Sequence, residues 1–275
     1  MFFKIIHFFL FFFICASSFS SNDTKFYGKF IQGGIVIGEN SLAKKVFLDN
    51  NELILSKDGF FIFGFGRNHK NISSLKIIEK NTEKLTFHKI NVKKRDYKIE
   101  VIDGLAPKMV SPGPEILKKI KKDRLLIGNG LSKSLVSNIF PLSFVKPAEG
   151  RTSGVFGSQR ILNGIKKNPH GGMDIAAPIG TPIKSSADGK VFLAEEDMYY
   201  TGNIVIIGHG HGLKTMYMHM NDIYVKNGDL VKQGQEIGTV GMTGRVTGPH
   251  LHWNVYWYKT KIDPELLLLI SKWKL

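Results

Sequence analysis

The sequence predicts a mainly β protein with a small antiparallel β domain, a short helical connector and a larger β-sheet-rich domain. From about Phe26 to Asp103, runs of four to eight residues rich in Ile, Phe, Val and Tyr are separated by turn residues such as Asp58-Gly59. This pattern is typical of short strands joined by tight turns. From Pro147 onward, glycines interrupt further β-type runs, and six of the nine histidines lie between His170 and His252. The second β region is therefore the place to look for a functional site.

Length and composition exclude several classes of protein. The chain has 275 residues, of which 43% are hydrophobic and 22% are charged. These values exclude a wholly disordered chain, and a polytopic membrane protein would need several long apolar runs. Cys15 is the single cysteine, so no intramolecular disulfide can form and cysteine-rich zinc arrangements are excluded. Any metal site must therefore use histidine and carboxylate ligands.

The first twenty residues read as a secretory signal. Lys4 precedes an apolar stretch from Ile5 to Cys15, and small residues follow from Ala16 to Ser18. This order matches a positive region, a short apolar region and a cleavage zone. We therefore expect an exported protein of the periplasm or cell envelope, with an uncleaved anchor as the alternative.

A helical connector is expected between the two β regions. Pro114 before Glu115 suits a helix start, Ile116, Leu117 and Ile120 recur at helical spacing, and Gly128 offers a stop. The lysines from Lys118 to Lys122 are interpreted as a solvated face, with contact to an anionic polymer or membrane as the alternative. The expected organisation is a signal peptide at 1–20, an accessory β domain at 21–106, the connector at 107–140 and the second domain at 141–275.

Two short motifs indicate a metal site. In "HLHWNVYWY", His250 and His252 are separated by one residue of a β-type run, so their side chains point to the same face of a strand. His170 and Asp174 flank "GGM", where paired glycines favour a loop or strand over a helix. Catalytic zinc takes three protein ligands of these types and leaves a fourth position for water.

These motifs occur in a longer pattern that resembles a known family. "HGGMDIAAPIGTPI", "ADGKV", "GNIVIIGHGHGLKTMYMHM", "VKNGDLVKQGQEIGTVGMTG" and "GPHLHW" follow one another in order. Together they closely resemble the lysostaphin-type, or LytM-domain, zinc metallopeptidases, from about Phe144 to Leu268. The N-terminal β region resembles, more loosely, a bacterial envelope subgroup with an extra β domain before the peptidase.

The resemblance implies a role for each site residue. His170, Asp174 and His252 match the zinc ligands, and His219 and His250 match the two catalytic histidines. It does not say which of the two is the general base. His209 and His211 in "GHGHG" imitate the spacing of the motif, but the family pattern gives them only a structural or substrate-edge role.

The implied function is a secreted zinc endopeptidase that hydrolyses the peptide cross-links of peptidoglycan. The subgroup favours D-alanyl-diaminopimelate bonds over glycine-rich bridges. The alternative is a non-catalytic protein that binds peptidoglycan or activates a cell-wall amidase, although the full set of site residues favours the enzyme.

Charge is unevenly distributed and suggests further partners. Residues 21–146 carry 23 Lys plus Arg against 12 acids, and residues 147–275 carry 14 against 11. The basic N-terminal half could associate with an anionic envelope surface, and a lysine-rich genomic bias explains it equally well. An export signal and the lack of a recognised motif argue against nucleic acid. The accessory domain could bind the wall, bind a partner or cover the catalytic groove, and the sequence does not give the oligomeric state.

Overall fold

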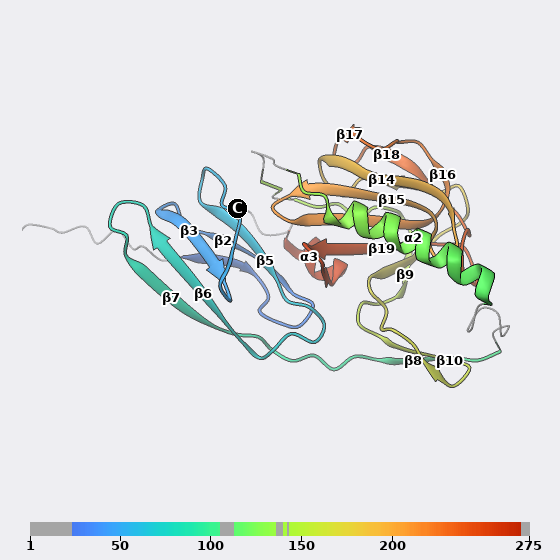
Figure 1. Ribbon diagram of the computed structural model, residues 1–275, viewed down its shortest axis with the longest axis horizontal. Coiled ribbons are helices and arrows are strands. Elements are labelled where there is room, and N and C mark those ends of the chain that lie inside the picture. The colour runs from blue at the N-terminus through green and yellow to red at the C-terminus, as the bar shows by residue number, and fades with distance from the viewer. Residues whose placement is uncertain (1–23, 105–112, 136–139, 142, 271–275) are drawn as a thin grey trace, which may run out of the picture.

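The computed structural model describes residues 24–104, 113–135, 140–141 and 143–270, and the expected signal at 1–20 lies outside them. It confirms the mainly β fold, with two β regions and a helix packed on the second (Figure 1). Within the described residues, no helix is long and apolar enough to cross a membrane.

The accessory half is a small β sandwich. Its strands are β1 (Lys25–Gly28), β2 (Ile35–Glu39), β3 (Ala43–Leu48), β4 (Asn51–Glu52), β5 (Phe60–Gly64), β6 (Ile72–Glu79) and β7 (Leu85–Asn91). They form two antiparallel sheets, in the orders β1-β2-β5 and β4-β3-β6-β7. Side chains from both sheets, among them Val36, Phe61, Phe63, Leu75 and Ile77, share one apolar core. Burial in β6 alternates residue by residue, as expected for a strand with one face in that core.

The C-terminal half is built on one large sheet. Its strands are β9 (Arg151–Gly154), β12 (Met173–Ala176), β13 (Pro182–Lys184), β14 (Gly189–Met198), β15 (Gly202–Gly210), β16 (Leu213–Ile223), β17 (Leu230–Val231), β18 (Glu236–Val240), β19 (His250–Trp257) and β20 (Thr260–Ile262). The main order is β17-β14-β15-β16-β19-β12-β9, with β18 paired to β13 and β16, and β20 paired to β19. The neighbouring strands β16, β19 and β12 carry most of the residues of the site described below.

The two halves share a hydrophobic core. Ile35, Ile37 and Ile62 of the accessory half belong to the same buried cluster as Ile175 and Ile262 of the large sheet. The short helix α3 (Pro264–Ile270) packs into this cluster through Leu267 and Ile270. Asp263 caps the start of this helix, because its carboxylate accepts a hydrogen bond from the Glu265 amide at 3.0 Å. Buried apolar surface therefore joins the halves.

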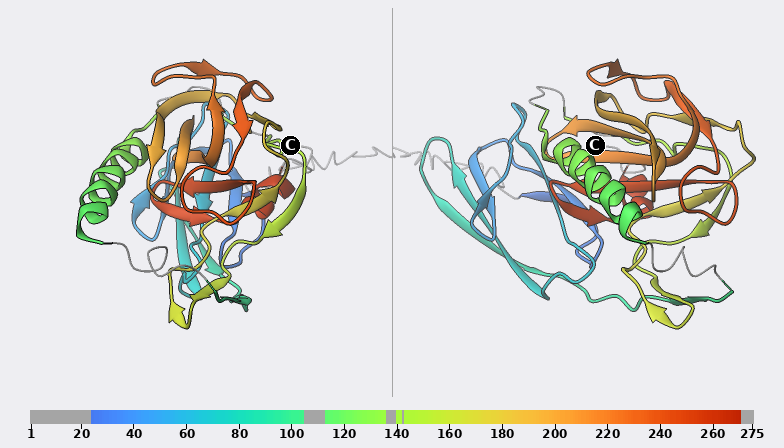
Figure 2. Two further views of the ribbon diagram at one scale, coloured as in Figure 1. Left: turned by 90° about the vertical axis from the view of Figure 1, so that its right-hand side faces the viewer. Right: turned by 45° about the vertical axis from the view of Figure 1, so that its right-hand side comes forward.

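The connector contains helix α2 (Pro114–Ser132), which lies over strands β14 and β15 (Figure 2). The predicted start at Pro114 is confirmed, but the predicted stop at Gly128 is wrong. The helix continues past Gly130, where a Cβ atom would lie 3.2 Å from Leu193 and from Ile206. This glycine serves the close approach of helix and sheet and does not cap the helix.

The strand predicted near residue 100 has an unexpected partner. We expected the run 97–103 to join the antiparallel accessory sheets, and that expectation is wrong. Strand β8 (Ile99–Ile102) pairs in parallel with β10 (Gln159–Leu162), which also pairs with β11 (Ile165–Lys166). This three-stranded sheet lies at the edge of the C-terminal half (Figure 1), so a segment of the accessory half reaches the second half beside the site.

Candidate metal centre

Strand β19 supplies one wall of the site through alternation of its side chains. Leu251, Trp253 and Val255 are fully buried in the core. The alternate residues His250, His252, Asn254 and Tyr256 line a cleft of about 650 Å³. The expectation that His250 and His252 share a face is therefore met.

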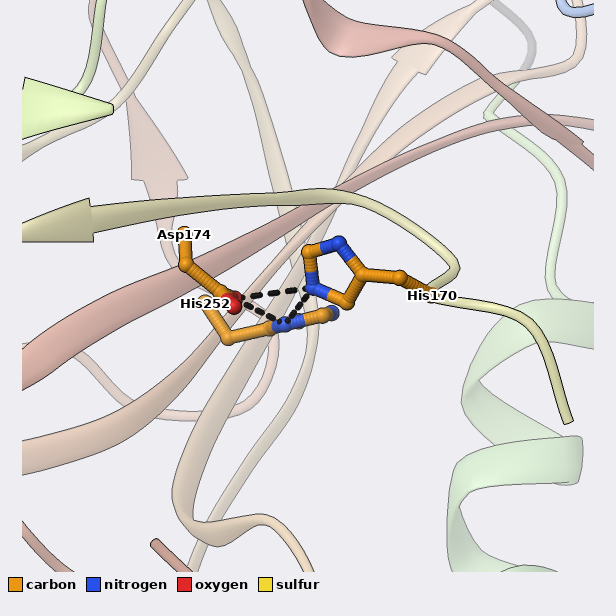
Figure 3. A group of neighbouring side chains, drawn as sticks. All are labelled: His170, Asp174 and His252. Atoms are coloured by element: carbon orange, nitrogen blue, oxygen red, sulfur yellow. Dashed lines mark hydrogen bonds and ion pairs between the residues drawn. The ribbon is translucent and has the colours of Figure 1, made fainter. Parts of the chain in front are cut away.

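Register places the candidate ligands opposite one another. Asp174 on β12 pairs directly with His252 on β19, and His170 reaches the same point from the loop before β12. The His252 Nδ1 atom lies 2.6 Å from Asp174 Oδ1 and 3.0 Å from His170 Nε2, and that Nε2 lies 2.9 Å from the same Oδ1. Three possible ligand atoms thus converge on one buried point (Figure 3).

The outer hydrogen bonds of the two imidazoles determine which nitrogens face this point. His170 Nδ1 donates to the Val155 carbonyl at 2.8 Å, and His252 Nε2 donates to Asn254 Oδ1 at 2.9 Å. A neutral imidazole has one donor and one acceptor, so the inward nitrogens carry lone pairs. Two lone pairs and a carboxylate oxygen at these distances repel unless a cation lies between them.

The protonation states of Asp174 and His252 also suit a bound cation. Burial raises the pKa of Asp174, but hydrogen bonds and charge from the protonated forms of His170 and His252 outweigh burial and hold that pKa well below its usual range. Burial is the main cause that lowers the pKa of His252, which favours its neutral form. An ionised carboxylate with neutral imidazoles is the donor set that Zn²⁺ and similar ions prefer.

His219 and His250 lie next to the cluster and have matching orientations. Their ring centroids are 4.9 Å apart. His219 Nδ1 donates to the Thr243 carbonyl and His250 Nδ1 donates to the Gly248 carbonyl, both at 2.9 Å. Each therefore keeps an Nε2 lone pair in its neutral form. Burial, and then the charges of His252 and His250, lower the pKa of His219 to about 3.

His219 has a strained backbone. Its φ of +63° lies in the left-handed region that residues other than glycine rarely adopt. Its amide donates to the Thr201 carbonyl at 2.9 Å, a bond that helps to hold this conformation. Strain of this kind collects at functional sites.

The cleft around the cluster is strongly basic. Its charged lining side chains are Arg124, Arg160, Lys167, Asp174, Arg245 and Lys261. Asp174 is the sole carboxylate among the described lining residues. An open cleft of this charge suits a ligand that carries carboxylates.

The remaining histidines of the second half lie outside this cleft. His209 donates from Nδ1 to the Asp188 carbonyl and contacts Thr215 Oγ1 through Nε2. His211 hydrogen-bonds the Ile54 carbonyl and packs on Phe140. Both are buried, so their contacts are structural.

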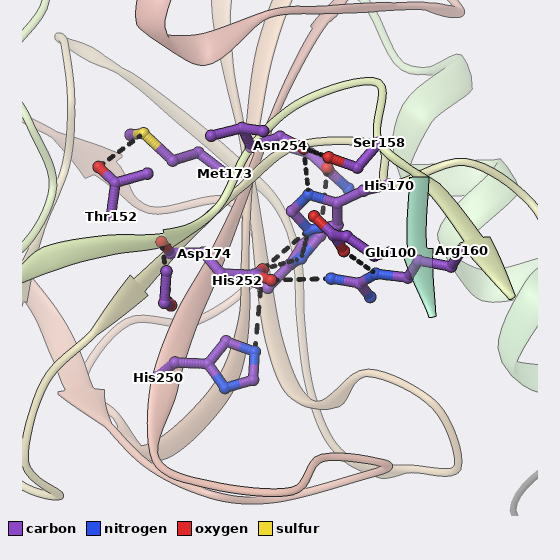
Figure 4. Close-up of polar contacts among 12 residues, drawn as sticks. Glu100, Thr152, Ser158, Arg160, His170, Met173, Asp174, His250, His252 and Asn254 are labelled. Carbon is purple, nitrogen blue, oxygen red and sulfur yellow. Dashed lines mark hydrogen bonds and ion pairs between the residues drawn. The ribbon is translucent and has the colours of Figure 1, made fainter. Parts of the chain in front are cut away.

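The sequence analysis missed two polar residues of the site. Asn254 orients His252, and its place two residues along the same strand could have revealed it. Arg160 donates to Asp174 Oδ2 at 2.9 Å (Figure 4). No local pattern indicates Arg160, because its contact depends on a fold that brings β10 to β12.

Comparison with known proteins agrees with this geometry. Residues 168–264 match the model of peptidase family M23. The chain is 39% identical over 152 residues to the peptidoglycan DD-endopeptidase ShyA of Vibrio cholerae, a match that covers 54% of this chain and 34% of ShyA. It is 46% identical over 100 residues to the DD-carboxypeptidase/endopeptidase Mpg of Neisseria meningitidis, covering 36% of this chain and 23% of Mpg. These two matches span about a third or less of each relative's length.

One solved structure resembles the chain beyond the matched domain. A Pseudomonas aeruginosa protein described as a peptidase M23 has 27% sequence identity and a TM-score of 0.67, and the match covers 87% of this chain and 95% of that one. The likeness therefore extends over the accessory half as well. Residues 168–264, in the C-terminal half of the chain, are therefore similar to peptidase family M23.

Proposed function

We propose that the protein is an exported zinc endopeptidase that hydrolyses peptide cross-links of peptidoglycan. The observation that carries this proposal is the convergence of His170, Asp174 and His252, beside His219 and His250, on one open cleft. The family match and the names of the relatives support the same interpretation.

His170, Asp174 and His252 would hold the metal. Two neutral imidazoles and one carboxylate leave a divalent ion with one net positive charge, which favours an oxyanion nearby. Zinc bound there supplies Lewis acidity, which polarises a carbonyl and lowers the pKa of water to about 7.

His219 and His250 would transfer the proton of the attacking water. In the neutral form each offers an Nε2 lone pair, because its Nδ1 is committed to a backbone carbonyl. The histidine that accepts the proton of the attacking water becomes a donor and can return the proton to the leaving amine. The other ring would hydrogen-bond the developing oxyanion. Either residue can serve as the base.

The basic cleft supports a substrate with free carboxylates. Stem peptides that contain diaminopimelate carry such groups, whereas glycine bridges are uncharged. We therefore propose D-alanyl-diaminopimelate cross-links as the substrate and the periplasm or envelope as the location. The excess of basic residues in the accessory half supports association with an anionic envelope surface.

Digestion of purified sacculi tests the activity. Protein that lacks residues 1–20 and is loaded with zinc should release soluble muropeptides, and mass analysis of the fragments should identify the broken bond. His219→Ala and His250→Ala should each reduce release by at least about 100-fold, since general acid–base catalysis contributes about 10²–10⁴-fold. His88→Gln in the accessory half is the control and should digest like wild type. If zinc-loaded wild type binds sacculi without releasing fragments, the protein is a binding protein or an amidase activator.

A further inference from the structure

The two oxygens of the Asp174 carboxylate have separate partners. Oδ1 faces His170 and His252, and Oδ2 accepts a hydrogen bond from Arg160 Nη2 at 2.9 Å (Figure 4). The Gly154 backbone also lies against Oδ2, because a Cβ atom there would be 2.3 Å from that oxygen. The carboxylate is therefore held from behind while its other oxygen points into the centre.

Arg160 is in turn held by a residue of the accessory half. Its Nε atom lies 3.3 Å from Glu100 Oε2, and the two residues are direct neighbours in the parallel β8–β10 pair. Both side chains are about 30% exposed. A chain of charged contacts therefore runs from Glu100 through Arg160 to Asp174.

The side-chain pattern of β8 is the reverse of an ordinary surface strand. Ile99 and Val101 face solvent and are 66% and 60% exposed, whereas Glu100 turns toward Arg160. A strand serving only to cover the sheet would bury its apolar residues and expose its acid. In β8, two β-branched side chains are exposed, and the Glu100 carboxylate instead contacts Arg160, which holds Asp174.

Two further contacts from the accessory half reach the segment that orients His170. Arg67 Nε donates to the Gly157 carbonyl at 2.7 Å, and the Tyr97 ring packs so closely on Gly157 that a Cβ atom there would lie 2.1 Å from it. The Gly157 amide donates to the His170 carbonyl, and the His170 amide donates to the Ser158 carbonyl. The accessory half thus contacts the outer partners of two candidate ligands.

We propose that Glu100 and Arg160 are positioning residues of the metal centre, so that the accessory half completes the site. Arg160 fixes the rotation of the Asp174 carboxylate, and Glu100 fixes the guanidinium that does so. The inference rests on the proposed metal site, and it assigns the accessory half a direct role in metal binding.

Zinc affinity measured by chelator competition on the full mature chain tests this role. Outer partners of metal ligands typically contribute about 10–100-fold in affinity, so Arg160→Met should weaken zinc binding by that factor. Arg160→Lys should recover part of the loss, because it keeps one donor and the charge. Glu100→Gln should weaken binding less, in the same direction, and should add nothing in the Arg160→Met background. Metal affinity is the readout because Arg160 also lines the cleft and could affect substrate binding.

Glu39→Gln is the matched control. Glu39 is also a 30% exposed acid in an ion pair, with Lys25, but it lies in β2 away from the centre. It should leave zinc affinity unchanged, and thermal unfolding will show that each variant folds. If Glu100→Gln lowers the unfolding temperature without changing zinc affinity, its contact only joins strands and the inference is wrong. Wild type that binds no zinc would overturn the proposed function as well.

Discussion

His252 and Asp174 face each other across the β19–β12 strand pair, with His252 Nδ1 2.6 Å from Asp174 Oδ1. Since the two residues occupy directly paired positions, backbone hydrogen bonds of the sheet fix their separation. The cluster is therefore preorganised by these strands, and His170 alone comes from a loop.

Asn254 should tune metal affinity through His252. Its Oδ1 accepts the His252 Nε2–H, which keeps the lone pair of Nδ1 facing the centre. Asn254→Leu should weaken zinc binding by about 10–100-fold, whereas Asn254→Asp should keep the acceptor and most of the affinity. Chelator competition measures both, and equal affinities for the two variants would show that this hydrogen bond does not matter.

Two glycines of helix α2 should respond differently to alanine. A Cβ atom at Gly128 would point into open space, so Gly128→Ala should raise the free energy of unfolding by about 0.5–1 kcal/mol through helix propensity. At Gly130 the new methyl group would lie 3.2 Å from Leu193 and Ile206, which should cancel or reverse that gain. Urea unfolding of the two variants tests the corrected helix boundary, and an equal gain at both positions would contradict the close packing.

A substitution in the accessory half should destabilise the C-terminal sheet. Arg95 Nη1 lies 2.7 Å from the Asp263 carboxylate, whose side chain is 5% exposed. Arg95→Met leaves that carboxylate buried without its cation and should cost about 3–5 kcal/mol. All three tryptophans lie in the C-terminal half, so their fluorescence should report the loss during urea unfolding.

The matched control for that substitution is Lys45→Met. Lys45 pairs with Glu52 on the surface, where both side chains are about half exposed, and such pairs contribute about 0–1 kcal/mol. If Arg95→Met leaves the urea concentration of the tryptophan fluorescence transition unchanged, the two halves unfold independently.

His209 should make the fold sensitive to acid. Burial lowers its pKa from 6.5 to about 4 in the folded state. Between pH 6.5 and 4 the unfolded chain therefore binds a proton that the folded chain does not, and stability falls as the pH falls, by up to about 3 kcal/mol. Above pH 6.5 the residue adds no slope.

Urea unfolding at several pH values between 7 and 4.5 measures this contribution. His209→Gln should be less stable than wild type at pH 7, since it disturbs the hydrogen bonds to Asp188 and Thr215. Its stability should nevertheless fall less steeply with acid. If the free energies of unfolding of wild type and variant fall equally with pH, other groups cause the acid sensitivity.

Local sequence patterns predict much of the fold and of the site, and contacts between distant residues explain the predictions that are wrong. The shared face of His250 and His252 follows from strand alternation, and the start of α2 follows from Pro114. The predicted stop at Gly128 is wrong, because the helix continues past Gly130, which packs on Leu193, 63 positions away. The pairing of β8 with β10 depends on a strand about 60 residues later, which no local pattern near residue 100 could reveal.

The zinc content of the purified chain tests the central claim most directly. Mature wild type dialysed against zinc and then against buffer should retain one zinc per chain, and His219→Ala should retain it too. Asp174→Ala and His252→Ala should each lose it, since each removes one of the three converging atoms. A wild type without zinc, or one whose zinc survives both ligand substitutions, would contradict the assignment of this cluster as the metal centre.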